Sequence, residues 1–439
     1  MKAKLGTSSV TPSDLASFSA TRAPSMGIML LFAALAYVVF VWALAFGGFG
    51  STATEVSEAE QLSQSNVGNQ LIWIFLAAAG LYVVFERISR GARPVFSASL
   101  IFLLAYLMLT LLSMTWALAP DISVRRSFQQ ILIVLIFTGV TMFVRDKVRV
   151  VNAAFLVLGF AILLNVLLFP VVPAGPLGYA GIYAQKNTLG AVSALSLIFA
   201  FSYLLSRGAT FKIFSLLIAL LSGALLFVSQ SKTSLGLAII CPLLAAGILV
   251  FSRMFHTSFL IAMAVIAAAM GLLFFAVVEG MQLSTEDISL LLFNDTTFTG
   301  RTYIWNYVLN FHDQRPWLGW GYQSFWAIGP DAPNLKADNF VSGLNQSHNG
   351  YVDVLLETGT AGFIVILAFL LALCRAIDRT WSQRADVAIL LLSLTLFCSA
   401  HNLLESSLTR GFAVPWVILL LVAGISNPAR EHAPSGQSP

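Results

Sequence analysis

The sequence predicts an all-α polytopic membrane protein of about twelve transmembrane helices, with one large ordered periplasmic loop between spans nine and ten. Of its 439 residues, 58% are hydrophobic and only 10% are charged, whereas soluble domains carry about 25% charged residues. Apolar runs recur at the length of roughly 20 residues that crosses a bilayer. A soluble fold could not cover this much apolar surface, so one helical membrane domain is the simplest interpretation.

Twelve apolar segments follow one another along the chain, and each is expected to form one span. They cover residues 26–46, 70–85, 97–118, 127–144, 151–169, 188–206, 213–229, 235–252, 259–278, 359–374, 387–403 and 412–426. The first is too long for a cleaved signal peptide and is expected to be retained. The expected domains are therefore a tail (1–25), nine spans (26–278), a loop (279–358), three spans (359–426) and a second tail (427–439).

The distribution of Lys and Arg predicts the orientation, because cytoplasmic loops are enriched in both. With both termini in the cytoplasm, most basic residues fall inside and most acidic residues fall outside. The basic residues left outside are Arg125, Arg126, Lys186, Lys232, Arg301, Arg315, Lys336 and Arg410. The net charge of +4 is therefore mainly a topology signal and predicts no nucleic-acid partner.

Five of these outer cations lie in polar turns. Arg125 and Arg126 lie in TWALAPDISVRRS, Lys186 in GYAGIYAQKNTLG, Lys232 in SQSKTS and Arg301 in TGRTYIWNYVLNF. If these turns converge, they form a basic pocket for an anion whose tail lies in lipid, such as a pyrophosphate-linked lipid. The alternative is that the side chains simply reach the lipid headgroups.

The long loop, 279–358, is rich in aromatic residues and is expected to be ordered. A helix is predicted over residues 301–312, lying flat on the membrane or on other helices. Its apolar side chains share one face, namely Ile304, Trp305, Val308 and Leu309. The segment PWLGWGYQSFW, 316–326, is expected to place most of its rings in an interfacial belt. A stacking surface for sugar rings is the alternative.

Three histidines fall on the outer side. His348 precedes a predicted helix and is the candidate general base, because an imidazole accepts protons near neutral pH. His312 is the rival base. His401, with Glu405 one turn later, is expected to form a structural or site-orienting pair.

The helix that follows His348 carries two acids and two glycines at helical spacing. Asp353 and Glu357 are expected on a common face, and Gly359 and Gly362 would let another helix approach closely. The two acids could ligate a cation, although metal dependence is not favoured. The cysteines Cys241, Cys374 and Cys398 lie in or beside apolar runs and are expected to act as small hydrophobes.

The stretch from His348 to Gly362, HNGYVDVLLETGTAG, has the form His-Asn, nine residues, Gly, two residues, Gly. It resembles the signature of the O-antigen ligase and O-antigen polymerase superfamily. The segments GRTYIW, PWLGWGYQSF, GYAGIYAQKNTLG, SQSKTSLG and HNLLESSL resemble the same domain, and the chain resembles it from about residue 100 onward. The SQSKTS and ESS elements are most similar to the exopolysaccharide-production branch.

The resemblance implies a metal-independent, cofactor-free glycosyltransferase in the bacterial inner membrane. The donor would be an undecaprenyl-pyrophosphate-linked oligosaccharide presented at the periplasmic face, and the acceptor a growing polysaccharide. His348 would activate the acceptor hydroxyl, and Arg301 would neutralise the pyrophosphate. Lys232 stands where the family often has Arg, which retains the charge but loses the bidentate geometry. The predicted substrate-binding residues are Lys232, Lys186, Arg125, Arg126, Asn349 and Glu405.

Three functions remain open from the sequence. The leading hypothesis is a polymerase that joins lipid-linked repeat units in exopolysaccharide synthesis, working with membrane lipids, a flippase and chain-length-control or export proteins. A ligase that transfers finished glycan to another acceptor would use the same chemistry. A glycan transporter or flippase is the third, but its polar groups would be expected near the bilayer midplane.

Overall fold

A computed structural model describes residues 24–41, 67–175, 178–206, 212–284, 287–288, 290, 300–326, 328, 332–337 and 340–430. Within this part the chain is almost entirely helical, and its only strand-type pairings are two isolated bridges. Several predicted features lie outside the described residues: most of the tail 1–25, residues 42–46 of the first span, part of the long loop, and residues 431–439.

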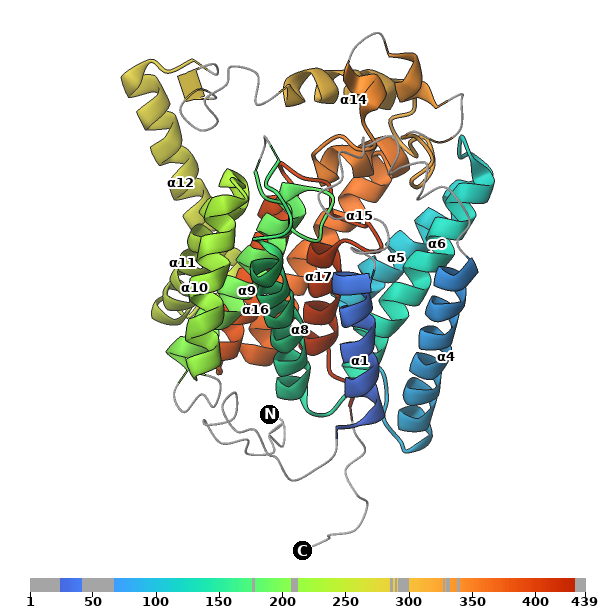
Figure 1. The fold of residues 1–439 in the computed structure, drawn as a ribbon, viewed down its shortest axis with the longest axis vertical. Coiled ribbons are helices and arrows are strands. Elements are labelled where there is room, and N and C mark those ends of the chain that lie inside the picture. Colours follow the sequence, from blue (N-terminus) through green and yellow to red (C-terminus); the bar gives the residue numbers. More distant parts are fainter. Residues whose placement is uncertain are drawn as a thin grey trace, which may run out of the picture.

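The helices run across the molecule in a bundle, and α14 lies over one end of it (Figure 1). We call this end the loop face. The crossing helices are α1 (Met26–Ala36) with η1 (Tyr37–Val41), α4 (Val67–Ser89), α5 (Ala98–Leu112) with η2 (Ser113–Thr115), α6 (Pro120–Val134) with η3 (Leu135–Val140) and α7 (Thr141–Phe143), α8 (Lys147–Leu168), α9 (Lys186–Leu205), α10 (Lys212–Val228), α11 (Lys232–Met254), α12 (Phe259–Met281), α15 (Gly350–Trp381), α16 (Ala385–His401) and α17 (Val414–Ser426).

These helices confirm the predicted fold class of an all-α, multi-pass membrane protein. Of the described helices, eight are long and apolar enough to cross a membrane and four are shorter apolar helices, and together they match the twelve predicted segments. The segment just after α17 lies beside the turn between α4 and α5, because the backbones of Arg430 and Arg93 exchange two hydrogen bonds.

Burial is concentrated in the middle of the bundle. Every residue of α17 is buried, whereas α12 buries only Phe259 and Ala262. Large apolar side chains such as Leu272 and Phe274 remain exposed on α12. A lipid-facing surface needs no polar coat, so an apolar exterior of this kind is expected for a membrane bundle.

The described part of the long loop has a small hydrophobic core of its own. In α14 (Arg301–Gln314) the side chains of Ile304 and Val308 are buried and pack with Phe325 and Leu356. Helix α14 therefore packs on α15, as one of the two predicted arrangements requires. Leu309, predicted on the same apolar face, is 40% exposed, because the packed face is narrower than the sequence pattern.

The interfacial belt predicted for residues 316–326 is wrong for most of its rings. Tyr322, Phe325 and Trp326 are buried. Trp326 Nε1 donates to Asp353 Oδ1 at 3.0 Å, and Tyr322 Oη donates to the Thr409 carbonyl. The rings fill the space between the loop and the bundle, where they satisfy polar groups that would otherwise be unpaired. Trp317, by contrast, is 70% exposed.

Helix α15 contains a break at Gly359, where φ is +66° and ψ is −170°. The turn at residues 316–321 packs into this break. The amides of Trp320 and Gly321 donate to the carbonyls of Leu356 and Glu357, and the Thr360 amide donates to the Pro316 carbonyl. Gly359 was predicted to admit another helix, but the segment that approaches it is this turn. Gly362 does lie close to a helix, because a Cβ there would meet Leu109 of α5 at 3.4 Å.

The break gives a stability prediction. A Cβ at Gly359 would lie 2.3 Å from the Trp317 carbonyl carbon, and the backbone conformation itself costs a non-glycine residue roughly 1–3 kcal/mol. Gly359→Ala should therefore lower the thermal unfolding midpoint in detergent. Gly271→Ala in α12 is the matched control, because nothing lies within 4 Å of that Cβ. Equal midpoints for the two variants would contradict this account of the break.

Candidate active site

Four segments meet at the loop face and bring most of the predicted site residues together. They are the start of α9, the start of α14, the residues just before α15, and the turn that follows α16. Asn402 shapes this last turn, because its side-chain oxygen accepts from the amides of Ser407 at 2.8 Å and Leu408 at 2.6 Å. The turn carries Glu405.

Glu405 is the centre of the site. Its Oε1 accepts hydrogen bonds from Arg301 Nη2 at 2.8 Å and from Asn187 Nδ2 at 2.6 Å. Its Oε2 lies 3.7 Å from His348 Nδ1. The Glu405 side chain is only 9% exposed. We call these four residues the Glu405 cluster.

The electrostatics of the cluster keep Glu405 charged. Burial alone would raise the pKa of the Glu405 carboxyl, but the neighbouring His348, His401 and Arg301 outweigh burial and hold that pKa below its ordinary value. Glu405 is therefore ionised at neutral pH. A buried carboxylate of this kind fixes the positions of the cations that it binds.

Three helices begin at this site with a basic residue: α9 with Lys186, α11 with Lys232 and α14 with Arg301. Lys186 lies within electrostatic range of Glu405, Lys232 and Arg301. A cation at a helix N-terminus faces the positive end of the helix dipole, which disfavours it. Three such termini close together, partly offset by one carboxylate, form a strongly electropositive place suited to an anion.

The start of α15 is fixed to the same turn. The Gly350 amide donates to the carbonyls of Asn402 and Glu405, and the Asn349 side chain caps the helix by accepting from the amides of Tyr351 and Val352. His348 has a left-handed backbone, with φ of +53°. Asn349 thus positions His348, and a substrate contact by Asn349 stays a prediction.

The other two histidines occupy different surroundings. His401 is buried, and its Nε2 lies 3.3 Å from Ser234 Oγ. It adds to the field around Glu405, in agreement with an orienting role. The rival base His312 lies at the far end of α14, where Nδ1 contacts the Leu355 carbonyl at 3.3 Å.

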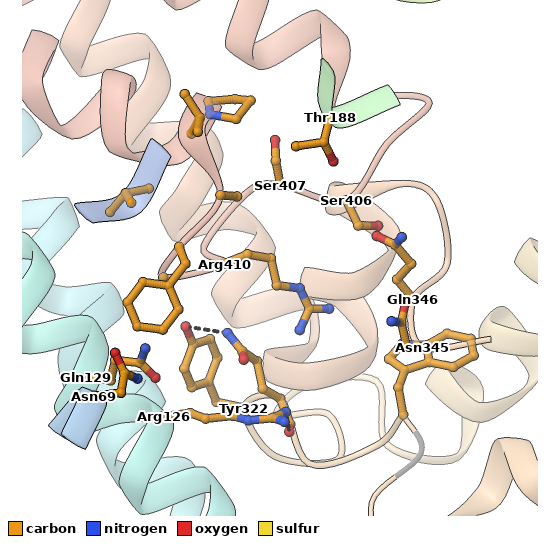
Figure 2. Close-up of a pocket in the computed structure, with 18 of the residues that line it drawn as sticks. Asn69, Arg126, Gln129, Thr188, Tyr322, Asn345, Gln346, Ser406, Ser407 and Arg410 are labelled. Carbon is orange, nitrogen blue, oxygen red and sulfur yellow. Dashed lines mark hydrogen bonds between the residues drawn. The ribbon is translucent and has the colours of Figure 1, made fainter. Parts of the chain in front are cut away.

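A cavity of about 750 Å³ opens beside the cluster. Glu405, Arg125 and Arg126 are the predicted site residues that line it, whereas Arg301, His348, Lys186, Lys232 and Asn349 do not form part of its wall. Figure 2 shows many of the neutral polar side chains that surround it. They include Asn69, Gln129, Gln185, Gln323, Asn345 and Gln346. Such groups both donate and accept hydrogen bonds, as sugar hydroxyls require.

A second charged group, centred on Arg410, forms another part of the wall. Arg410 lies 3.2 Å from Asp353 Oδ2 and 2.8 Å from Glu357 Oε1. Burial is the largest influence and would lower the pKa of Arg410, but Glu357 and Asp353 raise it above its ordinary value. The acids that the sequence left open as cation ligands thus share a guanidinium.

The sequence placed Arg410 among the outer cations but did not select it for the site. Its signal was indirect: Asp353 and Glu357 share a helical face at the outer end of α15 and need a cation there. Asn187 and Gln323 were also missed, because amide side chains carry no comparable signal.

Comparison with known proteins agrees with the motifs. Residues 216–367 match the O-antigen ligase family, Wzy_C. The chain is also similar to the exopolysaccharide production protein ExoQ of Rhizobium meliloti (strain 1021), with 24% identity over 359 residues that cover 78% of this chain and 82% of that protein. These matches confirm the predicted resemblance to the O-antigen ligase superfamily and its exopolysaccharide-production branch.

The Arg410 group gives a second stability prediction. Arg410→Gln would leave Asp353 and Glu357 buried without their cation, and breaking a buried ion pair costs about 3–5 kcal/mol. The variant should therefore unfold at lower temperature or denaturant concentration in detergent. Lys336→Gln, at an exposed position of the long loop, is the control and should stay close to the original midpoint. A stable Arg410→Gln protein would show that the ion pairs do not hold the turn.

Proposed function

We propose that this O-antigen ligase-like membrane protein is a glycosyltransferase that polymerises undecaprenyl-pyrophosphate-linked oligosaccharide units in exopolysaccharide biosynthesis. The carrying observation is the Glu405 cluster, in which a candidate base and a candidate phosphate-binding arginine contact one carboxylate beside a cavity that carries amide and hydroxyl side chains. The similarity to the exopolysaccharide production protein ExoQ supports the exopolysaccharide context.

We further propose that the loop face is periplasmic, in the bacterial inner membrane, with both chain ends in the cytoplasm. The support is the distribution of Lys and Arg, which favours the opposite face for the cytoplasm. The active site then lies on the periplasmic side. It is formed by the loop 279–358 together with the loop-face ends of the spans in the expected domains 26–278 and 359–426. A flippase would supply the donor, and chain-length-control or export proteins would receive the product.

In the proposed reaction the diphosphate of the donor lipid binds at Lys186, Lys232 and Arg301. These cations are fixed at helix ends, so they meet the negative charge that develops on the departing diphosphate without reorganising. The acceptor hydroxyl attacks the anomeric carbon, a new C–O bond forms, and the bond to the phosphate oxygen breaks with its electron pair. Lipid diphosphate is the leaving group.

The proton of the attacking hydroxyl passes to His348. Glu405 contacts the same imidazole and stabilises the imidazolium that forms, so the carboxylate acts through His348 and Arg301. The neighbouring cavity, with its amide and hydroxyl walls, would hold the sugars so that the hydroxyl lies in line with the donor. Placement of this kind removes a large part of the barrier.

A ligase is the second candidate, because the family that residues 216–367 match is described as O-antigen ligase. It would transfer finished glycan to another acceptor with the same cluster. The deciding experiment is reconstitution in liposomes with a defined lipid-linked oligosaccharide, with and without a metal chelator, followed by sizing of the products. Ladder formation from the lipid-linked units alone supports the polymerase, and no new glycosidic bond would refute both.

The first activity prediction concerns the base. His348→Gln should lower kcat by roughly 10²–10⁴-fold, the usual contribution of a positioned acid–base group, while the protein stays folded in the membrane. His312→Gln is the matched control, because His312 contacts a backbone carbonyl far along α14, and it should retain most activity. A stronger loss for His312→Gln than for His348→Gln would reverse the assignment.

The charge of Glu405 should also be needed for activity. Glu405→Gln keeps the shape but removes the charge that binds Arg301 and faces His348, so kcat should fall by about 10-fold or more, a typical effect of losing an orienting charged hydrogen bond. Glu405→Asp should recover part of the activity. Glu279→Gln, an exposed acid near the end of α12, should leave the rate unchanged. Unaltered kcat in Glu405→Gln would remove Glu405 from the mechanism.

A further inference from the structure

The cations of the loop face form two separate groups. Lys186, Lys232 and Arg301 lie at the starts of three helices and do not line the cavity. Arg301 binds Glu405, and Lys186 lies within electrostatic range of Glu405 and Lys232. Arg126 and Arg410 lie on the cavity wall itself, as does Arg125, which pairs with Asp121 of the same helix at 3.9 Å. One donor lipid has one diphosphate to place, and the first group already accounts for it in the proposed reaction.

Arg126 and Arg410 approach the same part of the cavity from different elements. Arg126 comes from α6 and Arg410 from the segment between α16 and α17, with Tyr322 beside them (Figure 2). Arg410 repels Arg126, while Glu357 attracts it. Two guanidinium groups on one cavity wall repel one another. An anion bound between them would relieve that repulsion.

The two arginines differ in how they are neutralised. Arg410 has two carboxylate partners, Asp353 and Glu357. Arg126 donates from Nη1 to the Gln323 carbonyl at 2.6 Å, and the described residues give it no carboxylate ion pair. Arg126 is thus a half-buried charge on the cavity wall whose bond goes to a neutral oxygen.

The remainder of the wall combines apolar surface with amide and hydroxyl groups, which suits a glycan carried on a lipid. Most of its surface is apolar, neutral amides and hydroxyls are set among the apolar side chains, and its carboxylates Glu357 and Glu405 are each bound by an arginine. An anion carried by a glycan or a lipid therefore finds partners on this wall as it reaches Arg126.

We propose that Arg126, with Arg410 beside it, forms a second anion subsite that binds an acidic group of the acceptor substrate. The group is a phosphate of a lipid-diphosphate anchor or a carboxylate on the glycan. This inference rests on the proposed function and deepens it. An enzyme that joins two lipid-linked units must hold two diphosphates at once, whereas transfer to a neutral acceptor needs only the donor subsite.

The test uses reconstituted full-length protein, one lipid-linked donor and three acceptors with the same oligosaccharide. The first acceptor carries a lipid diphosphate, the second a neutral lipid ether, and the third a neutral lipid ether plus one uronic acid. Transfer rates give kcat and KM for each acceptor with the original protein, Arg126→Gln, Arg126→Lys and the exposed control Lys336→Gln.

Arg126→Gln should raise KM at least 10-fold for an acidic acceptor and leave kcat and the KM of the neutral acceptor unchanged. Arg126→Lys should recover part of the affinity, and Lys336→Gln should change nothing. A penalty with the diphosphate acceptor alone identifies the anchor phosphate, a penalty with the uronic acid alone identifies a glycan carboxylate, and a penalty with both identifies a general anion subsite.

Equal increases in KM for acidic and neutral acceptors at unchanged kcat, or no effect on any acceptor, would overturn the subsite. Failure of the proposed function gives a different result, because the original protein would then form no glycosidic bond with any of the three acceptors. A folding defect is distinguished by the neutral acceptor, whose kcat would also fall.

Discussion

The arrangement depends on one buried carboxylate. Glu405 contacts Arg301, Asn187 and His348, which come from widely separated parts of the chain. An ionised carboxylate is costly to bury unless cations and hydrogen-bond donors surround it. The long loop must therefore reach the turn after α16, and α15 must begin beside that turn. A single electrostatic requirement thus joins the membrane bundle to the loop that covers it.

The broken helix α15 meets a second requirement. Its first half, at the loop face, carries Asp353 and Glu357 to Arg410, and its second half packs in the bundle along α5. A helix break exposes backbone groups that need partners, and the turn at 316–321 supplies them at Gly359. The same turn leads into Tyr322 and Gln323 on the cavity wall. The backbone of the loop therefore completes the helix and lines the cavity with one continuous segment.

The sequence predicted best those features that depend on residues close together in the chain. Apolar length alone located the spans, because each helix must satisfy its own backbone in lipid, and the isolated His348 and Arg301 stood out against an apolar background. The buried positions of Tyr322 and Trp326 could not be predicted, since an aromatic run reads the same at an interface as in a core. The division of the cations into two groups could not be predicted either, because it depends on which turns contact each other in the folded protein.

The cluster also links proton transfer to charge. Before reaction Glu405 is shared between Arg301, at 2.8 Å, and His348, at 3.7 Å, so part of the arginine charge is already offset. In the proposed reaction His348 becomes a cation as the hydroxyl proton arrives, and it then draws more of the carboxylate charge. Arg301 is left less neutralised at the moment when negative charge builds on the departing diphosphate. Stabilisation that grows in this way favours the transition state over the bound substrate, which is the condition for catalysis.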